Sequence, residues 1–296
     1  MAKRNNKWIS LYVFILPPFE HILVNCIEPL ASFLVKKGVV KKWFFIRYFE
    51  NGSHIRLRLQ LKNPSYKVEV SQLIKRKIEH FIEINNIERS NLNGEFVSIK
   101  DYLQETERYG GTLGIEMAES IFCESSKTVC EIIIQEYSKL SYEDAMKYSV
   151  ILNYILLYNL FLGEKKELEN FLMFSYLRWL PISFTRKINN YADYQANKCK
   201  VIKEIAESNF NIVHNKLQKN KAINNSIYFK WHEFTLNFSN RMRQSESQKK
   251  ISYTPKYDHL WKIYDSYIHM SNNRIGLNNE DEIVSTWVLL NLIKEH

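Results

Sequence analysis

The sequence predicts an α+β protein with a ferredoxin-like βαββαβ antiparallel sheet in its N-terminal half and a mostly helical C-terminal half. The first hundred residues alternate between strand-like and helix-like periodicity in that order, and the chain from about Leu113 onward has helical periodicity almost throughout. Gly (8) and Pro (6) are scarce among the 296 residues, which favours long regular elements. We expect one integrated domain, with a ferredoxin-like subdomain over residues 1–112 and a helical subdomain over residues 113–296.

Each N-terminal element has its own local signal. The first segment is rich in aromatic and aliphatic residues, the next has helical spacing and stops at Gly38, and Asn51-Gly52 is a strong hairpin signal between two later strands. The expected strands are Trp8–Leu16, Lys42–Phe49, His54–Leu61 and Glu95–Ile99, and the expected helices are Phe19–Lys37 and about Val68–Ile84.

The C-terminal half consists of segments with helical periodicity. Ser141 is an expected N-cap, because two acidic residues follow it in the first turn. Gln244–Lys250 contains no apolar residue and is expected to be a mobile loop. The expected helices are Gly114–Phe122, Ser126–Leu140, Tyr142–Leu162, Lys165–Phe174, Asn189–Glu207, a weaker span within Asn209–Arg243, Tyr257–Met270 and about Glu280–Ile293.

Composition and charge limit the function classes. The net charge of +9 indicates an anionic partner, which could be a nucleic acid, an acidic peptide or a carboxylate substrate. No RNA-binding signature is present, so we expect no direct requirement for nucleic acid. The four cysteines lack Cys-x-x-Cys spacing, which argues against a metal site and favours small buried residues in a reducing cytoplasm. The longest apolar run, Val150–Leu162, is too short to span a bilayer.

Three basic side chains on one face of a predicted strand are the most informative feature. Strand side chains alternate between faces, so His54, Arg56 and Arg58 point one way, and Ile55 and Leu57 point the other. This arrangement suits the capture of an anion, although a solvated sheet face would give the same pattern.

Two further segments carry candidate chemistry. Glu105 and Arg108 are three residues apart and could orient one another, or form a purely structural ion pair. The run Gly110–Gly114 that follows could hold a phosphate at a helix start, but it lacks the Lys-Ser/Thr of a P-loop. Near the C-terminus, His269 and Arg274 form a basic cluster at the end of a predicted helix.

Taken in order, these motifs resemble one protein family over nearly the whole chain. They are similar to the C-terminal domain of lantibiotic dehydratases, a module that also occurs as a free-standing protein in thiopeptide-type bacteriocin biosynthesis. The motifs that carry the resemblance are the Trp8 strand, Trp43–Tyr48 leading to His54–Arg58, Tyr102 with Glu105 and Arg108–Gly111, Ala118–Phe122, and His269-Met270 with Asn273-Arg274. Glu124-Ser125, where the family usually has Asp-Ser, and Ser271-Asn272 depart from the pattern.

The resemblance implies two activities. Lantibiotic dehydratases of class I remove glutamate from a glutamylated Ser or Thr of a precursor peptide, leaving dehydroalanine or dehydrobutyrine. A thiopeptide relative instead joins two dehydroalanines in a formal [4+2] aza-cycloaddition that closes the macrocycle, forms a pyridine and expels the leader peptide. The residues implied for elimination are His269, Arg108, Arg56, Arg58 and Glu105.

The chemistry of elimination makes sense of these residue types. A histidine can remove a weakly acidic Cα proton, which favours His269 as the base. Arginines offer bidentate hydrogen bonds to the departing carboxylate and to the enolate-like charge, which suits Arg56, Arg58 and Arg108. His54, Tyr109, Arg274 and Tyr48 are the expected substrate-binding residues, with the tyrosines as walls of the site.

We therefore expect a stand-alone eliminase that needs no cofactor and no metal, with its active cleft where the arginine strand faces the helix carrying His269. The alternatives are the pyridine-forming cycloaddition and a non-catalytic subunit that captures a leader peptide by strand addition. The expected partners are a precursor peptide and a separate glutamylating subunit that uses glutamyl-tRNA, and a homodimer is also an open expectation.

Overall fold

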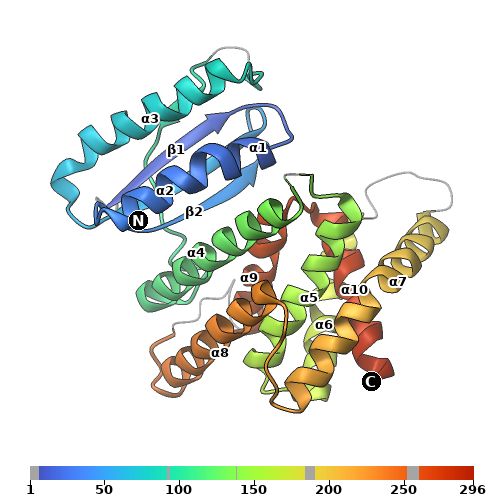
Figure 1. Cartoon of the computed structure of the whole chain (residues 1–296). Coiled ribbons are helices and arrows are strands. Elements are labelled where there is room, and N and C mark those ends of the chain that lie inside the picture. The colour runs from blue at the N-terminus through green and yellow to red at the C-terminus, as the bar shows by residue number, and fades with distance from the viewer. Residues whose placement is uncertain (1–6, 92–93, 138, 184–190, 252–259) are drawn as a thin grey trace. The chain divides into compact units, whose positions relative to one another are not determined.

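The computed structural model describes residues 7–91, 94–137, 139–183, 191–251 and 260–296. Figure 1 shows the chain from the N-terminal sheet to the C-terminal helices. By its internal contacts the chain divides into two compact units, Met1–Leu140 and Ser141–His296. The helix that begins at Gly111 contacts the sheet and falls in the first unit by this measure, and the division expected at 112/113 stays a prediction.

The first unit contains a four-stranded antiparallel sheet. Its strands are β1 (Trp8–Phe14), β2 (Val40–Tyr48), β3 (His54–Leu61) and β4 (Val97–Ile99), in the spatial order β2-β3-β1-β4. This order, with the two central strands β1 and β3 antiparallel, is the ferredoxin-like arrangement that the sequence predicts. The strand β3 has the predicted bounds, and β4 is shorter than predicted.

One face of this sheet is apolar and lies against helices. Its side chains on the two central strands, such as Leu11 and Leu57, are fully buried or nearly so. The helix expected over Phe19–Lys37 is present but contains a π-helical turn, so that α1 (Glu20–Ile22), the turn Leu23–Ile27 and α2 (Glu28–Lys36) follow one another directly. The second covering helix, α3 (Lys67–Ile84), contacts β1 and β4, as α2 contacts β2 (Figure 1).

The helix α4 (Gly111–Gln135) packs against β2 and corrects one expectation. Two helices were expected, with a break after Phe122, but the structure has a single helix of 25 residues. The serines at this point do not end the helix, because Ser125 and Ser126 donate their hydroxyls to the carbonyl of Phe122 one turn earlier.

The second unit is built from helices throughout its described residues. They are α5 (Tyr142–Leu160), α6 (Lys165–Ser183), α7 (Tyr191–Gln218), α8 (Ser226–Ser247), α9 (Leu260–Ile275) and α10 (Asn279–Glu295). The predicted N-cap is confirmed, because the hydroxyl of Ser141 accepts from the backbone N–H of Asp144 at 3.0 Å. The helix α5 is buried over most of its length and contacts α7, α8, α9 and α10.

Some helix ends differ from the sequence-based expectation. The helix α6 continues beyond Phe174, α7 continues beyond Glu207, and α8 continues to Ser247, where a loop over Gln244–Lys250 was expected. The polar end of α8 is stabilised locally, since the hydroxyl of Ser245 donates to the carbonyl of Arg241. The expected start of α9 at Tyr257 lies outside the described residues. Within the described residues, no helix combines the length and the hydropathy needed to cross a membrane.

Candidate functional site

The second face of the sheet carries the basic strand. In the register of the sheet, Arg58 lies opposite Ser10 of β1 and Phe44 of β2, and Arg56 lies opposite Tyr12 of β1. The strand alternation predicted from the sequence is therefore correct, because Arg56 and Arg58 share one face with these aromatic neighbours and the apolar residues of β3 occupy the other.

Arg58 is a buried cation in an aromatic setting. Its side chain is only 4% exposed, and its guanidinium lies over the rings of Tyr12 and Tyr102 at 5.1 and 5.2 Å from their centroids. Its hydrogen bonds, to the Tyr12 hydroxyl at 3.5 Å and to the Leu57 carbonyl at 3.4 Å, are long, and its Nε has no hydrogen-bond partner among the described residues. No carboxylate pairs with it in the described part of the chain, and burial lowers its pKa.

On the same face, the partly exposed Arg56 contacts the buried His54. The Nε of Arg56 donates to the Nε2 of His54 at 3.1 Å, and its guanidinium lies over the ring of Tyr48 at 3.4 Å and pairs with the exposed Glu50 at 3.3 Å. The ring of His54 stacks on Tyr12. Burial lowers the pKa of His54 and the charges of the neighbouring arginines act in the same direction, while the hydrogen bond to the Gly52 carbonyl opposes the shift.

A second set of polar groups lies near Tyr102, whose ring contacts Arg58. The carboxylate of Glu119, on α4, accepts from Gln104 at 2.6 Å and from Lys42 at 3.3 Å, and it also interacts with Tyr102. Burial raises the pKa of Glu119, and burial together with the neighbouring Glu119 charge raises that of Tyr102 well above its ordinary value, so Tyr102 stays a neutral phenol against Arg58.

These supporting residues are not among the predicted site residues. From the sequence, Tyr102 and Glu119 belong to the family motifs, and Glu119 is also a possible ion-pair partner of Arg108. The alternation of Trp8, Ser10 and Tyr12 along the first strand was the available signal for Tyr12, since alternate residues of neighbouring strands share a face.

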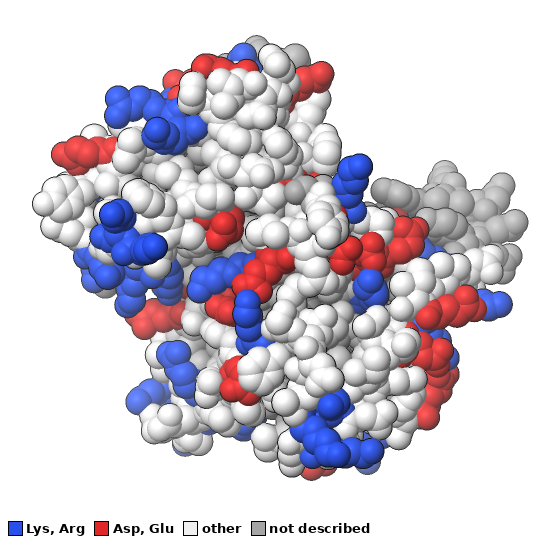
Figure 2. Space-filling model, viewed as in Figure 1, with Lys and Arg blue, Asp and Glu red and all other residues white. Residues whose placement is uncertain are grey.

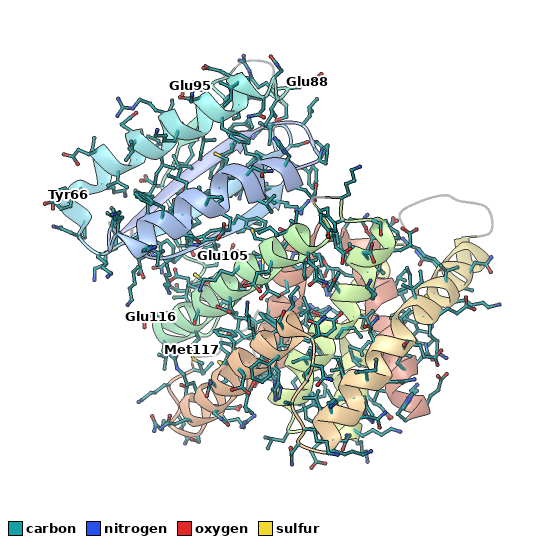
Figure 3. All side chains as sticks on the ribbon, viewed as in Figure 1. Tyr66, Glu88, Glu95, Glu105, Glu116 and Met117 are labelled. Atoms are coloured by element: carbon teal, nitrogen blue, oxygen red, sulfur yellow. The ribbon has the colours of Figure 1, made fainter. Side chains whose placement is uncertain are left out.

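Glu105 and Arg108 lie in the segment that leads into α4. Arg108 pairs with Glu105 at 3.1 Å, as the spacing predicts, and its guanidinium lies 5.5 Å from the ring centre of Tyr109. Figure 3 labels Glu105, and Glu116 and Met117 on α4. Tyr109 is buried against Phe122, consistent with a wall residue, and a common pocket for Arg108 and Arg58 stays a prediction.

The glycines that follow Arg108 have a steric explanation. Gly110 and Gly111 have positive φ angles of 83° and 95°, which only glycine adopts easily. A Cβ on Gly114 would meet the carbonyl oxygen of Tyr109 at 1.6 Å. The run therefore allows a tight turn that packs against the start of α4, and this accounts for it without a bound phosphate.

In the second unit, His269 lies on α9 between an acid and an aromatic ring. Its Nδ1 is 2.8 Å from Oε1 of Glu282 on α10, and its ring stacks on Trp179 of α6 with centroids 4.9 Å apart and planes inclined by 22°. Trp179 is held in turn by Asp265, whose two oxygens each lie 3.1 Å from the indole nitrogen. The imidazole is partly exposed, while Glu282 and Asp265 are buried.

Arg274 lies in a different environment from the one expected. Its side chain is fully buried and donates to the carbonyl of Met270 one turn earlier on α9. A fully buried guanidinium fits a role in holding the helix packing together, and the substrate-binding role stays a prediction. The nearby Asn272 is also buried and accepts from Ser149 at 2.8 Å and from Asn153 at 3.0 Å, so this motif ties α9 to α5.

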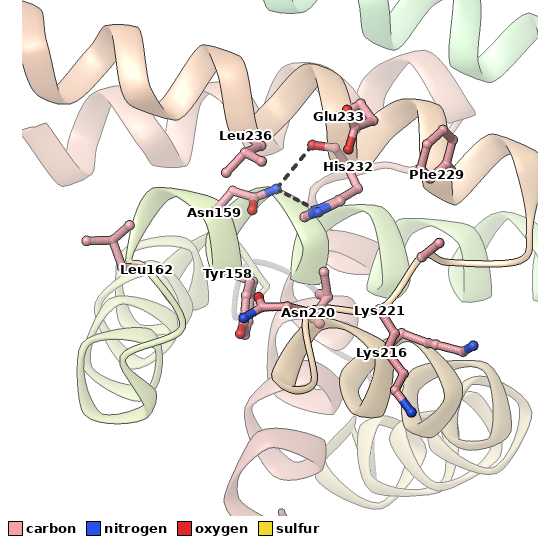
Figure 4. Close-up of a pocket in the computed structure, with 12 residues that line it drawn as sticks. Tyr158, Asn159, Leu162, Lys216, Asn220, Lys221, Phe229, His232, Glu233 and Leu236 are labelled. Carbon is pink, nitrogen blue, oxygen red and sulfur yellow. Dashed lines mark hydrogen bonds between the residues drawn. The ribbon is translucent and has the colours of Figure 1, made fainter.

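A separate hollow of about 460 Å³ lies in the second unit among α5, α7 and α8. Figure 4 shows its labelled residues, with the amide of Asn159 donating to Nδ1 of His232 at 3.1 Å. None of the predicted site residues lines this hollow. In the described part of the chain, no cluster of His, Cys, Asp and Glu could hold a metal ion.

The surface charges of the protein are mixed. On the face shown in Figure 2, Lys and Arg side chains alternate with Asp and Glu side chains and do not form one continuous basic surface. On this face the basic side chains therefore do not form a single tract of the kind that follows a nucleic-acid backbone.

Comparisons with known sequences agree on one family. Residues 8–293 match the family model of the lantibiotic biosynthesis dehydratase C-terminal domain. The chain is 23% identical over 292 residues to the nisin biosynthesis protein NisB of Lactococcus lactis subsp. lactis, and 27% identical over 282 residues to the epidermin biosynthesis protein EpiB of Staphylococcus epidermidis. These matches cover 97% and 93% of this chain but only 25% and 24% of the relatives, so the chain spans about a quarter of their length.

Solved structures show the same fold at low identity. TsrL superposes with a TM-score of 0.70 at 14% identity, covering 97% of this chain and 94% of TsrL. The tRNA-dependent lantibiotic dehydratase MibB of Microbispora sp. 107891 gives 0.66 at 16% identity, covering all of this chain and 28% of MibB. The pyridine synthase TbtD gives 0.63 at 9% identity, with 98% of both chains covered. Because the family model matches nearly the whole chain, the protein belongs to the lantibiotic dehydratase C-terminal family.

Proposed function

We propose that this protein removes glutamate from glutamylated Ser or Thr residues of a ribosomally made precursor peptide. In this reaction a base takes the Cα proton, its electrons form the Cα=Cβ double bond, and the Cβ–O ester bond breaks so that glutamate leaves as a carboxylate. The products are a dehydroamino acid in the peptide and free glutamate. A separate subunit that uses glutamyl-tRNA supplies the glutamylated peptide.

The observation that carries this proposal is the environment of Arg58. A buried guanidinium without a carboxylate among the described residues is costly in the free protein, and an anionic group that approaches it would relieve this cost. Glutamate elimination supplies such a group, because the departing carboxylate gains charge as the ester bond breaks. Groups placed where charge develops contribute strongly to catalysis.

The second unit supplies a group of the opposite kind. His269 is a partly exposed imidazole whose Nδ1 is hydrogen-bonded to a buried carboxylate, an arrangement that supports proton acceptance at the other ring nitrogen. We assign His269 as the base, and Arg56, Arg58 and Arg108 as the groups that hold the glutamyl and enolate oxygens. The proposal requires both sets of residues to act on the same glutamylated residue.

The formal cycloaddition is the second candidate function. The pyridine synthase TbtD has the same fold over 98% of both chains, so a module of this size and fold can carry that activity. At 9% identity the likeness concerns the fold alone. A buried arginine and a carboxylate-bound histidine favour elimination, because ring formation between two dehydroalanines releases no carboxylate.

A substrate comparison with one variant tests the proposal. The protein is incubated with a glutamylated peptide, and in parallel with a peptide that already carries two dehydroalanines, and mass spectrometry follows both. We expect loss of glutamate from the first substrate. His269→Ala should lower that rate by about 10²–10⁴-fold while the thermal stability and peptide binding are kept. Consumption of only the second substrate, with release of a leader fragment, would establish the cycloaddition instead.

A further inference from the structure

The imidazole of His269 is held on two sides by groups from three helices. Glu282 on α10 contacts its Nδ1 at 2.8 Å, and the indole of Trp179 on α6 lies against its ring face. Asp265 precedes His269 by one helical turn on α9 and fixes Trp179 through the indole N–H. Its own position is fixed by Arg178 at 2.7 Å and Ser175 at 2.5 Å. The ring therefore has little freedom to rotate.

The contact with Glu282 decides which ring nitrogen carries the proton. An ionised carboxylate only accepts hydrogen bonds, so a neutral imidazole that contacts ionised Glu282 through Nδ1 carries its proton there. The Nε2 atom then keeps its lone pair, and it has no hydrogen-bond partner among the described residues. If this ring is the base, its Nε2 atom therefore accepts the substrate proton.

Glu282 is suited to this task because it is buried, with only 3% of its side chain exposed. Burial raises the pKa of Glu282, and the contact with His269 opposes that rise. Among the described residues, the charged groups near the ring are the carboxylates of Glu282 and Asp265 and the guanidinium of Arg178, which pairs with Asp265.

We propose that Glu282 is a positioning residue that fixes His269 in the Nδ1–H tautomer and presents Nε2 to the substrate. This inference rests on the proposed function for its catalytic consequence, but the tautomer itself is a property of the free protein. The alternative is that Glu282 and His269 form a purely structural pair between α9 and α10.

The first arm of the test needs no substrate. Nitrogen-15 NMR of protein labelled at histidine reports the tautomer of each ring, and comparison with His269→Ala identifies the His269 signals. We expect the Nδ1–H tautomer in the wild type. In Glu282→Gln the amide can accept or donate, so the Nε2–H tautomer should become populated. Glu295→Gln is the matched control, because it makes the same change in an exposed ion pair on α10 and should leave the tautomer unchanged.

The second arm measures elimination. Glu282→Gln should lower kcat at least about tenfold with little change in KM, but by less than the loss of the base itself, and Glu282→Asp should give an intermediate kcat because it keeps the charge. A purely structural role would instead lower the thermal stability of both variants, and kcat would follow only the folded fraction.

The outcomes separate the two proposals. A wild-type ring in the Nε2–H tautomer, or a Glu282→Gln variant that keeps both the Nδ1–H tautomer and the wild-type kcat, would overturn the role of Glu282. A wild type that never releases glutamate would overturn the proposed function, while the NMR result would still decide whether Glu282 fixes the ring.

Discussion

A substitution at Arg58 tests whether the buried charge of this residue contributes to activity at a cost in stability. Arg58→Met removes the guanidinium and keeps an apolar stem of similar shape. If the charge is unpaired in the free protein, the variant should be more stable than the wild type and less active. Such a trade-off is characteristic of a group kept for function at a cost in stability.

The magnitude follows from the contacts of Arg58. Burial of a charged group costs several kcal/mol. Two cation–π contacts, with Tyr12 and Tyr102, offset this by about 0.5–2 kcal/mol each, and the hydrogen bonds at 3.4 and 3.5 Å add little. We therefore expect Arg58→Met to raise the free energy of unfolding by about 1–3 kcal/mol. Each kcal/mol corresponds to a rise in Tm of about 2–4 °C for a chain somewhat smaller than this one.

Urea unfolding and elimination kinetics measure the two effects. The matched control is Arg56→Met, which removes a guanidinium from the same face that is paired with the exposed Glu50 and lies over Tyr48. We expect this control to lose between 0 and about 2 kcal/mol, because partly solvated contacts contribute little. The activity of Arg58→Met should fall about 10²–10³-fold, as for other groups that stabilise developing charge. A folded Arg58→Met variant that is less stable than Arg56→Met would refute the argument that the Arg58 charge is uncompensated.

Two further predictions concern α4. Ser126→Ala should lower the free energy of unfolding by about 1–3 kcal/mol, because it leaves the buried N–H of Phe45 without the acceptor that now lies at 3.1 Å. Ser125→Ala loses only a bond to the Phe122 carbonyl and should lower the free energy of unfolding by less in the same urea assay. Equal losses in the two variants would contradict this reasoning. Burial raises the pKa of Glu119, so its carboxyl group keeps a proton to higher pH in the folded state than in the unfolded state. The free energy of unfolding should therefore fall as the pH rises from about 4.5 through the pKa of the folded state. The unfolding free energy of Glu119→Gln, relative to wild type, should therefore increase across that window, and a relative decrease would show that ion pairing outweighs burial.

Local patterns in the sequence predict much of the first unit correctly. Period-two alternation places Arg56 and Arg58 on one face, and the Asn51-Gly52 turn predicts the hairpin between β2 and β3. In the second unit, the side chain of Ser141 caps α5 as expected, because capping involves only neighbouring residues. The sheet order follows from the βαββαβ order of elements, since few topologies connect such elements without crossing.

The features that define the site arise from contacts between distant segments. The burial of Arg58 depends on Tyr102, 44 positions later in the printed sequence, and the position of Tyr102 depends on Glu119 of α4. Glu282 lies 13 residues beyond His269 on another helix, so helical spacing alone does not place it beside the ring. The continuity of α4 was missed for a related reason, because serine is a weak helix former whose hydroxyls are satisfied here within the helix.

Around the candidate residues the two units bury charged groups of opposite sign, Arg58 in the first and Glu282 and Asp265 in the second, and this difference matches the two demands of the proposed elimination. In the first unit, Arg58 is cationic and lacks a carboxylate among the described residues, which suits a group that becomes anionic as it departs. In the second, Glu282 and Asp265 are buried close to His269, which suits a group that becomes cationic as it accepts a proton. Both environments support the proposed elimination: Arg58 has no carboxylate partner among the described residues, and the partly exposed His269 contacts the buried Glu282. The pattern is instead that expected when substrate charges develop during a reaction, a negative charge on the leaving carboxylate and a positive charge on the base.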